Sequence, residues 1–395
     1  MRKKIILGTI GILVLASAVG GYIFRGQIRE IAAKIKHSSS PVACKTGVTE
    51  VNSLYDFKYC KVREKSVVIF EPNPYHHECL PGYTKYFTDL GYNVDTLIID
   101  GNQDSMAFFE PHDNVRIFTY ENLDQIKSNS KSIKERFNKY DYVLIHSTDP
   151  SKKDLYESLG VYDNEKSLFI AHDTNIVKNM GMEKYFDENR VLTLGNFEDG
   201  LQVNPHYFGE FEQKNKNPKT RFFITSTTGR KYEYLVEAAK TLKKEGENFE
   251  ILVVGRSSDF TAKNIPENLK ENFVFKHGLP YKEMYEEVQN SDYVIITLDP
   301  ENENDNAFKN LRMTGSSQLS YGFLKPMIIH KEFAENYRAS NKIGFIYEKS
   351  NFTDIMRQAT QLNAREYKIK QNNLKAIAKE IYNVSFENLK AAMRI

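Results

Sequence analysis

Short apolar runs alternate with amphipathic segments along most of the chain. Runs such as Val67 to Phe70 are typical of strands that are buried on both faces of a sheet. Elsewhere Leu235, Ala238, Ala239 and Leu242 recur at the spacing of one helix face. Strands that alternate with helices predict an α/β protein, in which helices cover both faces of a parallel sheet.

The alternation occurs in two series, separated by polar residues 213–218. The first series predicts helices over 83–90 and 126–137 and strands over 67–70, 94–99, 115–118, 142–145, 168–171 and 191–194. The second predicts helices over 232–244 and 281–289 and strands over 221–225, 249–254, 273–276, 293–297, 326–329 and 343–347. We therefore predict two Rossmann-like domains, 66–205 and 219–365, that face each other across a cleft. A C-terminal helical segment, 366–395, is expected to pack at the domain junction.

The N-terminal segment, 1–37, has the pattern of a membrane anchor. Residues 5–24 are uncharged and mostly apolar, and about 20 helical residues span the roughly 30 Å of a bilayer core. A cleaved signal peptide is the alternative, because Ala16-Ser17-Ala18 fits a cleavage site. The apolar run continues past that site, which favours one uncleaved transmembrane helix. Residues 28–36 resemble a helix at the membrane surface, and residues 38–65 are interpreted as a linker.

The composition gives no indication of a nucleic-acid partner, a disulfide framework or a zinc site. The 395 residues are 41 % hydrophobic and 27 % charged, which is ordinary globular usage. A net charge of +2 gives no indication of a nucleic-acid partner. The cysteines are Cys44, Cys60 and Cys79, and their number and spacing suggest neither a disulfide framework nor a zinc site. Cys79 beside His77 and Glu78 is a weak candidate for a metal cluster, and no metal site is predicted.

Residues 293–326 contain the most informative motif. An apolar strand is followed by an acidic loop, and then Thr314-Gly315-Ser316-Ser317-Gln318 leads into a helix. Ligands of α/β proteins bind at the carboxyl ends of parallel strands, and the N–H groups of a helix start suit a phosphate. An ordinary capped helix beside a solvated loop is the alternative interpretation.

Histidines and carboxylates follow two predicted strands of the first domain. His76, His77 and Glu78 come after the first strand, and His172 and Asp173 follow the strand at 168–171. A histidine beside a carboxylate can orient a hydroxyl group or remove its proton. These five residues are the candidate catalytic residues, although a buried structural role is the alternative for each. The remaining histidines considered are weaker candidates: His146, His112, His206 and His330.

The second half resembles the donor domain of GT-B glycosyltransferases of the glycosyltransferase-4 type. The resemblance covers roughly residues 220–347 and depends on the loop at 226–231, a strand ending in Gly255, the Phe-Lys-His-Gly turn at 275–278 and a helix leading to Lys325-Pro326. The first half resembles the acceptor domain more weakly, through residues 71–78 and 169–173. The resemblance implies a metal-independent transfer of a sugar from a nucleotide-sugar donor, with no further cofactor.

Particular donor-site residues follow from this resemblance. Arg230 falls at the position of the family's phosphate-binding lysine, with Lys231 beside it, and a fixed cation would stabilise the leaving diphosphate. The implied donor-binding set is Arg230, Lys231, Gly255, Glu301, Glu303, Thr314, Gly315, Ser316, Ser317 and Gln318. The family's pair of glutamates spaced by seven residues is missing: Glu301, Glu303 or Asp305 is the candidate replacement for the first, and the second position falls near Gln318 or Leu319. The acidic spacing at 299–305 is also similar to a calcium loop, but Asn304 and Asn310 occupy positions where such loops have Gly and Glu.

These observations favour a membrane-anchored enzyme that transfers a sugar to a glycan or lipid-linked acceptor in surface polysaccharide or glycoconjugate synthesis. The globular part is expected to face the compartment that holds nucleotide sugars, which is the cytoplasm in a bacterium. The alternative is a non-catalytic glycan-binding or assembly protein with the same fold, which the missing glutamates allow. A nucleotide-sugar epimerase is a weaker alternative, because it needs no membrane.

Overall fold

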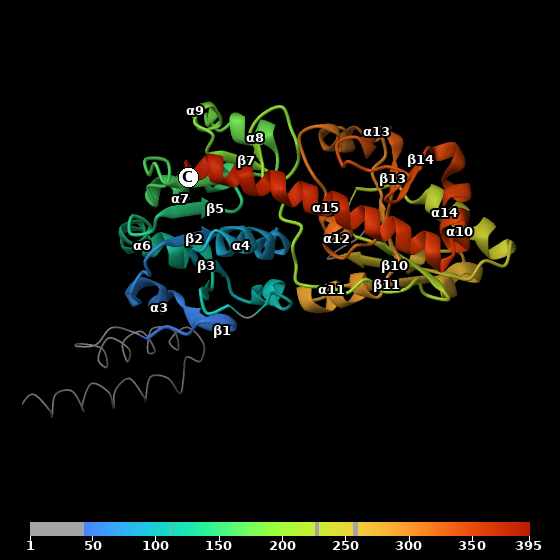
Figure 1. Ribbon diagram of the computed structural model, residues 1–395, viewed down its shortest axis with the longest axis horizontal. Coiled ribbons are helices and arrows are strands. Elements are labelled where there is room, and N and C mark those ends of the chain that lie inside the picture. The colour runs from blue at the N-terminus through green and yellow to red at the C-terminus, as the bar shows by residue number, and fades with distance from the viewer. Residues whose placement is uncertain (1–42, 111, 226–228, 256–259) are drawn as a thin grey trace, which may run out of the picture.

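The computed structural model describes residues 43–110, 112–225, 229–255 and 260–395 (Figure 1). The predicted α/β class is confirmed, because the strands form two separate parallel sheets with helices around them. The expected transmembrane helix lies in residues 1–37, outside the described residues. Among the helices of the described residues, none combines the length and apolarity that crossing a bilayer requires.

The first sheet has eight parallel strands in the order β1-β4-β3-β2-β5-β6-β7-β8. Its strands are β1 (Gly47–Ser53), β2 (Ser66–Phe70), β3 (Asn93–Ile99), β4 (Val115–Tyr120), β5 (Tyr142–Ile145), β6 (Ser167–Ala171), β7 (Val191–Thr193) and β8 (Leu201–Gln202). The helices of this domain are α3 (Leu54–Tyr59), α4 (Leu80–Asp89), α5 (Leu123–Ser128), α6 (Ser130–Phe137), α7 (Lys153–Ser158), α8 (Thr174–Lys178) and α9 (Glu183–Asp187).

The second sheet has six parallel strands in the order β11-β10-β9-β12-β13-β14. Its strands are β9 (Thr220–Ile224), β10 (Phe249–Gly255), β11 (Phe273–His277), β12 (Tyr293–Ile296), β13 (Met327–His330) and β14 (Phe345–Tyr347). Its helices are α10 (Glu233–Lys244), α11 (Tyr281–Gln289), α12 (Gly315–Gly322), α13 (Lys331–Ala334) and α14 (Phe352–Gln361), and α15 (Ala364–Met393) runs along both domains (Figure 1).

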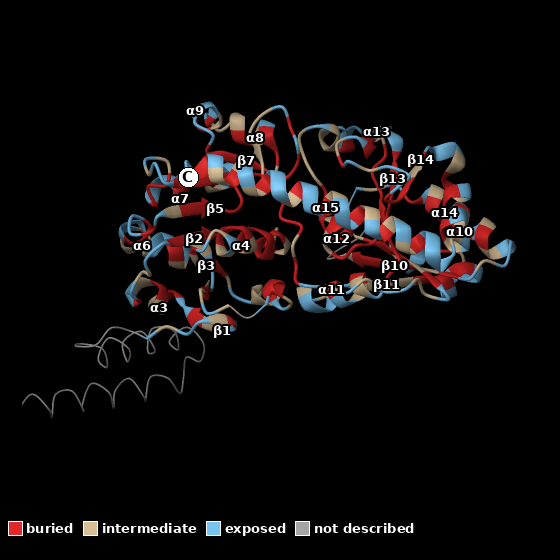
Figure 2. Cartoon of the chain, in the orientation of Figure 1, coloured by how far each residue is buried: buried red, intermediate tan, exposed pale blue. Residues whose placement is uncertain are grey.

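The side chains of successive residues in each central strand pack in two different hydrophobic clusters. In β2, Val67 and Ile69 belong to one buried cluster, whereas Val68 and Phe70 belong to another. Side chains of successive strand residues point to opposite faces, so helices must cover both faces of the sheet. This explains why the strands are continuously apolar and why they are buried in Figure 2.

The linker expected over 38–65 needs correction. Residues Gly47–Ser53 form the edge strand β1, which pairs with β4, and α3 follows directly. Ser53 caps this helix in a reciprocal capping box with Asp56. Val48, Leu54 and Phe57 supply the buried contacts of this unit. In β1 only Val48 and the polar residue Asn52 are buried, so the sequence shows no strand periodicity there.

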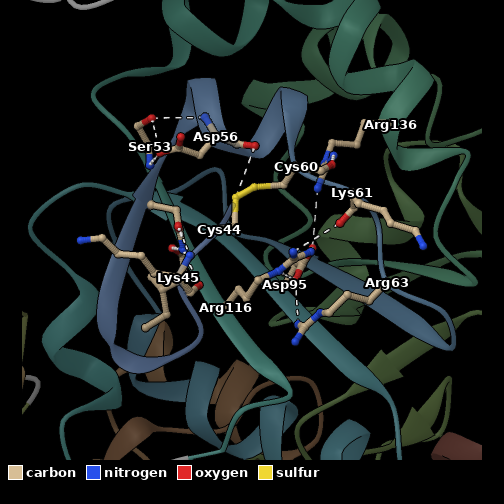
Figure 3. Close-up of a disulfide and its surroundings, with 12 residues drawn as sticks. Cys44, Lys45, Ser53, Asp56, Cys60, Lys61, Arg63, Asp95, Arg116 and Arg136 are labelled. Atoms are coloured by element: carbon tan, nitrogen blue, oxygen red, sulfur yellow. Dashed lines mark hydrogen bonds and ion pairs between the residues drawn. A yellow bond between two sulfur atoms is a disulfide. The ribbon is translucent and has the colours of Figure 1, made fainter. Parts of the chain in front are cut away.

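A disulfide between Cys44 and Cys60 closes this β1–α3 unit (Figure 3). The expectation that the cysteines form no disulfide was therefore wrong. The pairing depends on β1 and α3, which return Cys60 to within 6.1 Å of Cys44 between Cα atoms. Cys79 is a free, buried cysteine.

The two domains are held together by α15 and by the segment that joins them. The hydroxyl group of Ser385 in α15 accepts a hydrogen bond of 3.0 Å from the backbone N–H of Asn204. Helix α12 approaches the joining segment so closely that a Cβ at Gly322 would lie 2.5 Å from the carbonyl oxygen of His206. Only glycine fits at that approach without displacing one of the domains.

Asp95 is the centre of a buried charge cluster beneath the segment that follows Cys60 (Figure 3). Its carboxylate accepts hydrogen bonds from Arg63 at 2.9 Å, from Arg116 at 2.8 and 2.5 Å and from the hydroxyl group of Tyr140 at 2.6 Å. Arg136 lies 3.8 Å from the same carboxylate and donates to the carbonyl oxygen of Cys60 at 2.6 Å. One carboxylate thus balances three guanidinium groups.

We expect Asp95→Asn to lower the free energy of unfolding by about 3–5 kcal/mol, because the buried Arg116 and Arg136 and the half-buried Arg63 lose the carboxylate at the centre of the cluster. Urea unfolding followed by circular dichroism measures this change. Glu237→Gln is the control, since that carboxylate is exposed and pairs with Lys240 at the surface. Equal stability of the two variants would show that the cluster does not hold this domain together.

Candidate functional site

A cavity of about 810 Å³ lies between the two domains, where the carboxyl ends of both sheets meet. The first domain lines it with the loops after β2 and β3, and the second with the loops after β9, β10 and β11 and with the start of α12. In open α/β sheets this edge is where ligands bind. We call this cavity the interdomain cleft.

The loop after β2 brings His76 and Glu78 to the wall of the cleft. His76 has a φ of 68°, in the left-handed region that residues with a side chain seldom adopt. This conformation ends the extended loop and starts the short helical turn His77–Cys79. Unlike its neighbours, His77 points inward and is fully buried, with its ring centroid 6.4 Å from that of Tyr281.

Glu78 is an ionised carboxylate held between the domains. Burial by itself would raise its pKa, but the hydrogen bond to His76 and the charges of His76 and His77 lower the pKa to about 2. Its Oε2 accepts a hydrogen bond of 3.4 Å from the hydroxyl group of Tyr281 in the second domain. A carboxylate with so low a pKa is a hydrogen-bond acceptor rather than a strong base.

His172 follows β6 and stacks on His76, with ring centroids 3.9 Å apart. Burial lowers the pKa of His172 well below its ordinary value, and repulsion from His76 and His146 lowers it further. His172 is therefore a neutral imidazole near pH 7. Its Nε2 lies 3.4 Å from the hydroxyl group of Ser147 and 3.2 Å from the carbonyl oxygen of His146.

Glu71 is a buried carboxylate that contacts His146 directly and His172 through Ser147. It was not among the predicted site residues. The side chain is fully buried, and its Oε2 lies 2.5 Å from Nδ1 of His146 and accepts a hydrogen bond of 2.6 Å from Ser147. Its Oε1 accepts a hydrogen bond of 2.7 Å from the backbone N–H of Asn73. The chain Glu71–Ser147–His172–His76 thus runs from a buried carboxylate to the cleft wall. The signal in the sequence was a charged residue directly after a buried strand.

Asp173 has two structural partners. It caps α8 by accepting a hydrogen bond of 3.0 Å from the backbone N–H of Ile176, and it pairs with Arg312 of the second domain. The backbone N–H of Thr174 also donates to the carbonyl oxygen of Leu311 at 3.4 Å. These contacts join the domains beside the cleft, so Asp173 has a structural explanation independent of catalysis.

On the opposite wall, glycines lie among larger residues such as Tyr281, Met284 and Leu319. Gly255, Gly278 and Gly315 all contribute to the lining. A Cβ added at Gly315 would lie 3.6 Å from Oε1 of Glu78, which shows how near the start of α12 is to the first domain. At these glycines a ligand can approach the backbone closely.

The predicted residues at 314–318 start α12. The hydroxyl group of Thr314 caps the helix by accepting from the backbone N–H of Ser317, whose own hydroxyl donates to the carbonyl oxygen of Thr314 at 2.8 Å. Ser316 and Ser317 are buried, and the thiol of Cys79 donates to Oε1 of Gln318 at 3.5 Å. The side chains in this segment are therefore engaged in the protein, and what faces the cleft is the helix start at Gly315.

Of the ten predicted donor-site residues only Gly255 and Gly315 line the cleft, and besides the buried residues around Gly315 four more lie outside it. Arg230 is largely buried and pairs with Asp305, with its guanidinium carbon 5.1 Å from the ring centroid of Phe308. Lys231 is exposed beside it. The carboxylate of Glu301 pairs with Lys349, and Glu303 is exposed at the start of a short helical turn. The structure therefore does not bring these four side chains together with His76 and Glu78.

Within the described residues no group of three or more His, Cys, Asp or Glu side chains is arranged to hold a metal ion. This includes the weak candidate at His77, Glu78 and Cys79, as well as the acidic loop at 299–305.

We expect His172 to stay neutral at pH 6, because burial opposes protonation. The unfolded chain takes up this proton below about pH 6.5, so stability falls as the pH drops through that value. Nuclear magnetic resonance of the histidine ring nitrogens, assigned with His172→Gln, measures the pKa directly. His76→Ala should raise the pKa of His172 by removing one repulsion. Titration of His172 at or above pH 6.5 in the wild-type protein would contradict this account of the site.

No protein-family model matches the chain, and no curated protein does. Among solved structures, a glycosyltransferase from Rickettsia africae has a TM-score of 0.51 at 14 % identity, covering 84 % of this chain and 99 % of that one. Anabaena Alr3699/HepE, in complex with UDP and glucose, has a TM-score of 0.50 at 14 % identity, covering 83 % and 99 %. The complex of Alr3699/HepE with UDP-glucose gives 0.50 at 13 % identity. The likeness extends over both domains, and the chain has the two-domain GT-B fold of glycosyltransferases.

Proposed function

We propose that this protein is a glycosyltransferase that moves a sugar from a nucleotide-sugar donor to a glycan or lipid-linked acceptor. The observation that carries the proposal is the interdomain cleft itself. It joins a polar wall with His76 and Glu78 to a glycine-lined wall with a helix start. Transfer between two substrates needs such a site, because each wall can hold one substrate against the other.

The second domain is proposed to bind the donor. The start of α12 offers backbone N–H groups and the positive end of the helix dipole to a diphosphate. Gly255 and Gly278 leave room for the nucleotide to lie against the backbone. The structural neighbour that carries UDP and glucose supports this assignment, although only through its fold. We propose that the protein needs no metal and no further cofactor.

The first domain is proposed to bind the acceptor. The ionised carboxylate of Glu78 can accept a hydrogen bond from a sugar hydroxyl, and the imidazole rings of His76 and His172 can orient a second hydroxyl. Glu71 and Ser147 would position His172 rather than contact the substrate, because Glu71 is fully buried behind it.

Arg230 contributes to donor binding only if a diphosphate replaces Asp305 as its partner. We expect Arg230→Ala to weaken binding of UDP and of its sugar conjugate together by about 1.5–3 kcal/mol, the usual worth of a hydrogen bond to a charged group. Isothermal titration calorimetry measures both affinities. Lys231→Ala is the matched control and should change neither, because that side chain is exposed. Unchanged affinity in Arg230→Ala would leave Arg230 as the structural partner of Asp305.

We propose that residues 5–24 anchor the protein in a membrane and that the globular part faces the compartment that supplies nucleotide sugars. In a bacterium this is the cytoplasm, where Cys44 and Cys60 would exist as neighbouring thiols, because disulfides persist mainly in oxidising compartments. A Cys44–Cys60 pair that is bonded in the cell, as it is in the structure, would instead place the globular part on an oxidising side and contradict this proposal. Mass spectrometry after alkylation in intact cells, which separates free thiols from the bonded pair, decides between the two sides.

A non-catalytic glycan-binding protein is the second candidate. It is favoured by the pairing of Arg230 with Asp305 and of Asp173 with Arg312, which neutralises charged residues that a transferase would use. Such a protein would bind nucleotide sugars or glycans without turnover.

The proposal is tested by incubating the purified full-length protein in detergent with a panel of nucleotide sugars and measuring donor hydrolysis. We expect release of the nucleoside diphosphate from one class of donor. His172→Ala should lower this rate more than it lowers donor affinity, since His172 supports His76 of the acceptor wall by stacking on its ring. Donor binding without hydrolysis or transfer to any glycan would favour the second candidate, and absence of binding would contradict both the donor site and the enzyme.

A further inference from the structure

A second hollow, of about 680 Å³, lies at the opposite edge of the first sheet, where the strands begin. Six cationic side chains line it, with two carboxylates, Glu64 and Asp141: Lys58, Lys61, Arg63, Lys65, Arg136 and Lys139. Helices α3 and α6 flank it at the end of the molecule remote from the second domain (Figure 1). We call this surface the basic face.

The buried cluster beneath the basic face accounts for part of its charge. Arg63 and Arg136 are turned inward toward Asp95, which also binds Arg116. One carboxylate against three guanidinium groups leaves a positive excess at low dielectric directly under the surface. This excess repels cations and attracts anions at the hollow above it.

Exposed lysines of the basic face remain available for a partner. Lys61 and Lys139 are exposed, and within the described part of the chain their amino groups form no ion pair or hydrogen bond. Figure 3 shows the amino group of Lys61 pointing away from the Asp95 cluster. Beside them Tyr59 is 48 % exposed, a large aromatic side chain of the kind that favours the membrane–water interface.

The N-terminal segment joins the globular part beside the basic face, which indicates that a membrane is the partner of this face. The described residues begin at 43, and the disulfide fastens Cys44 to Cys60, which lines the hollow. The apolar run at 5–24 therefore joins the globular part beside the basic face. The inference rests on the proposed anchor at 5–24: residues 25–43 are long enough to let the basic face touch the membrane that such an anchor would enter.

We propose that the basic face is a membrane-docking surface that binds anionic lipid headgroups. An anchor and a basic surface together hold a protein at a membrane far more firmly than one of them does. Each lysine near an anionic surface contributes about 1 kcal/mol, or roughly fivefold in the binding constant. When the basic face contacts the membrane, the interdomain cleft lies at the opposite edge of the first sheet. The length of β2, about 17 Å for five residues, separates the two edges.

Hydrogen–deuterium exchange of the full-length protein in vesicles tests the proposal. On vesicles containing phosphatidylglycerol, we expect slower exchange at residues 55–65 and 136–141 than on purely zwitterionic vesicles. The protection should weaken in high salt, because ions screen exposed charges. Residues 278–284 at the cleft are the internal reference and should exchange equally on both vesicles.

Lys61→Glu with Lys139→Glu should abolish the difference between the two vesicles. Lys61→Gln with Lys139→Gln removes the two charges without reversing them and so is less disruptive to folding. This pair should reduce the equilibrium constant for contact between the basic face and the anionic membrane about 25-fold. The matched control is Lys244→Glu with Lys263→Glu, which makes the same charge change at exposed lysines of the second domain and should retain the protection. Circular dichroism confirms that each variant is folded.

Equal exchange on both kinds of vesicle, or protection that survives the Lys61 and Lys139 substitutions, would overturn the proposal. Protection by added RNA but not by anionic vesicles would also overturn it, and would identify the basic face as a polyanion groove instead.

Discussion

Burial of α15 against both domains determines where the two sheets meet. Leu374 and Ile381 pack in a core of the second domain, whereas Leu389 and Met393 pack in a core of the first. Burying four such side chains is worth several kcal/mol, enough to fix one arrangement of two otherwise separate cores. The close approach at Gly322 then leaves little freedom for sliding. The interdomain cleft and every contact across it depend on this junction.

The cleft combines two electrostatic environments as a consequence. On the first domain, burial keeps His172 neutral while His76 keeps Glu78 ionised, so the wall presents hydrogen-bonding groups with fixed protonation near pH 7. On the second domain, glycines expose backbone and a helix start. Such a division suits an uncharged hydroxyl acceptor on one side and an anionic donor on the other. The amino edge of the first sheet, with its excess of cations, is chemically separate from the cleft.

Much of the fold could be predicted from the sequence, because buried parallel strands are continuously apolar and therefore conspicuous. The edge unit β1–α3 could not be predicted, because β1 buries only Val48 and the polar Asn52 and so shows no strand periodicity. The Cys44–Cys60 bond depends on that unit. Residues that follow strands, such as His76, Glu78 and Gly255, were predicted to lie near a cleft, because the carboxyl ends of parallel strands all lie at one edge of the sheet. Their roles remain predictions. The linkage of Glu71 to Ser147 and the pairing of Arg230 with Asp305 join distant segments, which neither periodicity nor spacing reveals.

The central claim is that the interdomain cleft binds a nucleotide between the two domains. Hydrogen–deuterium exchange of the full-length protein with and without saturating UDP tests it most directly. The account predicts slower exchange with UDP at residues 278–284 and 315–319, with residues 58–65 at the basic face unchanged. Unchanged exchange throughout the cleft, or protection confined to the basic face, would contradict it.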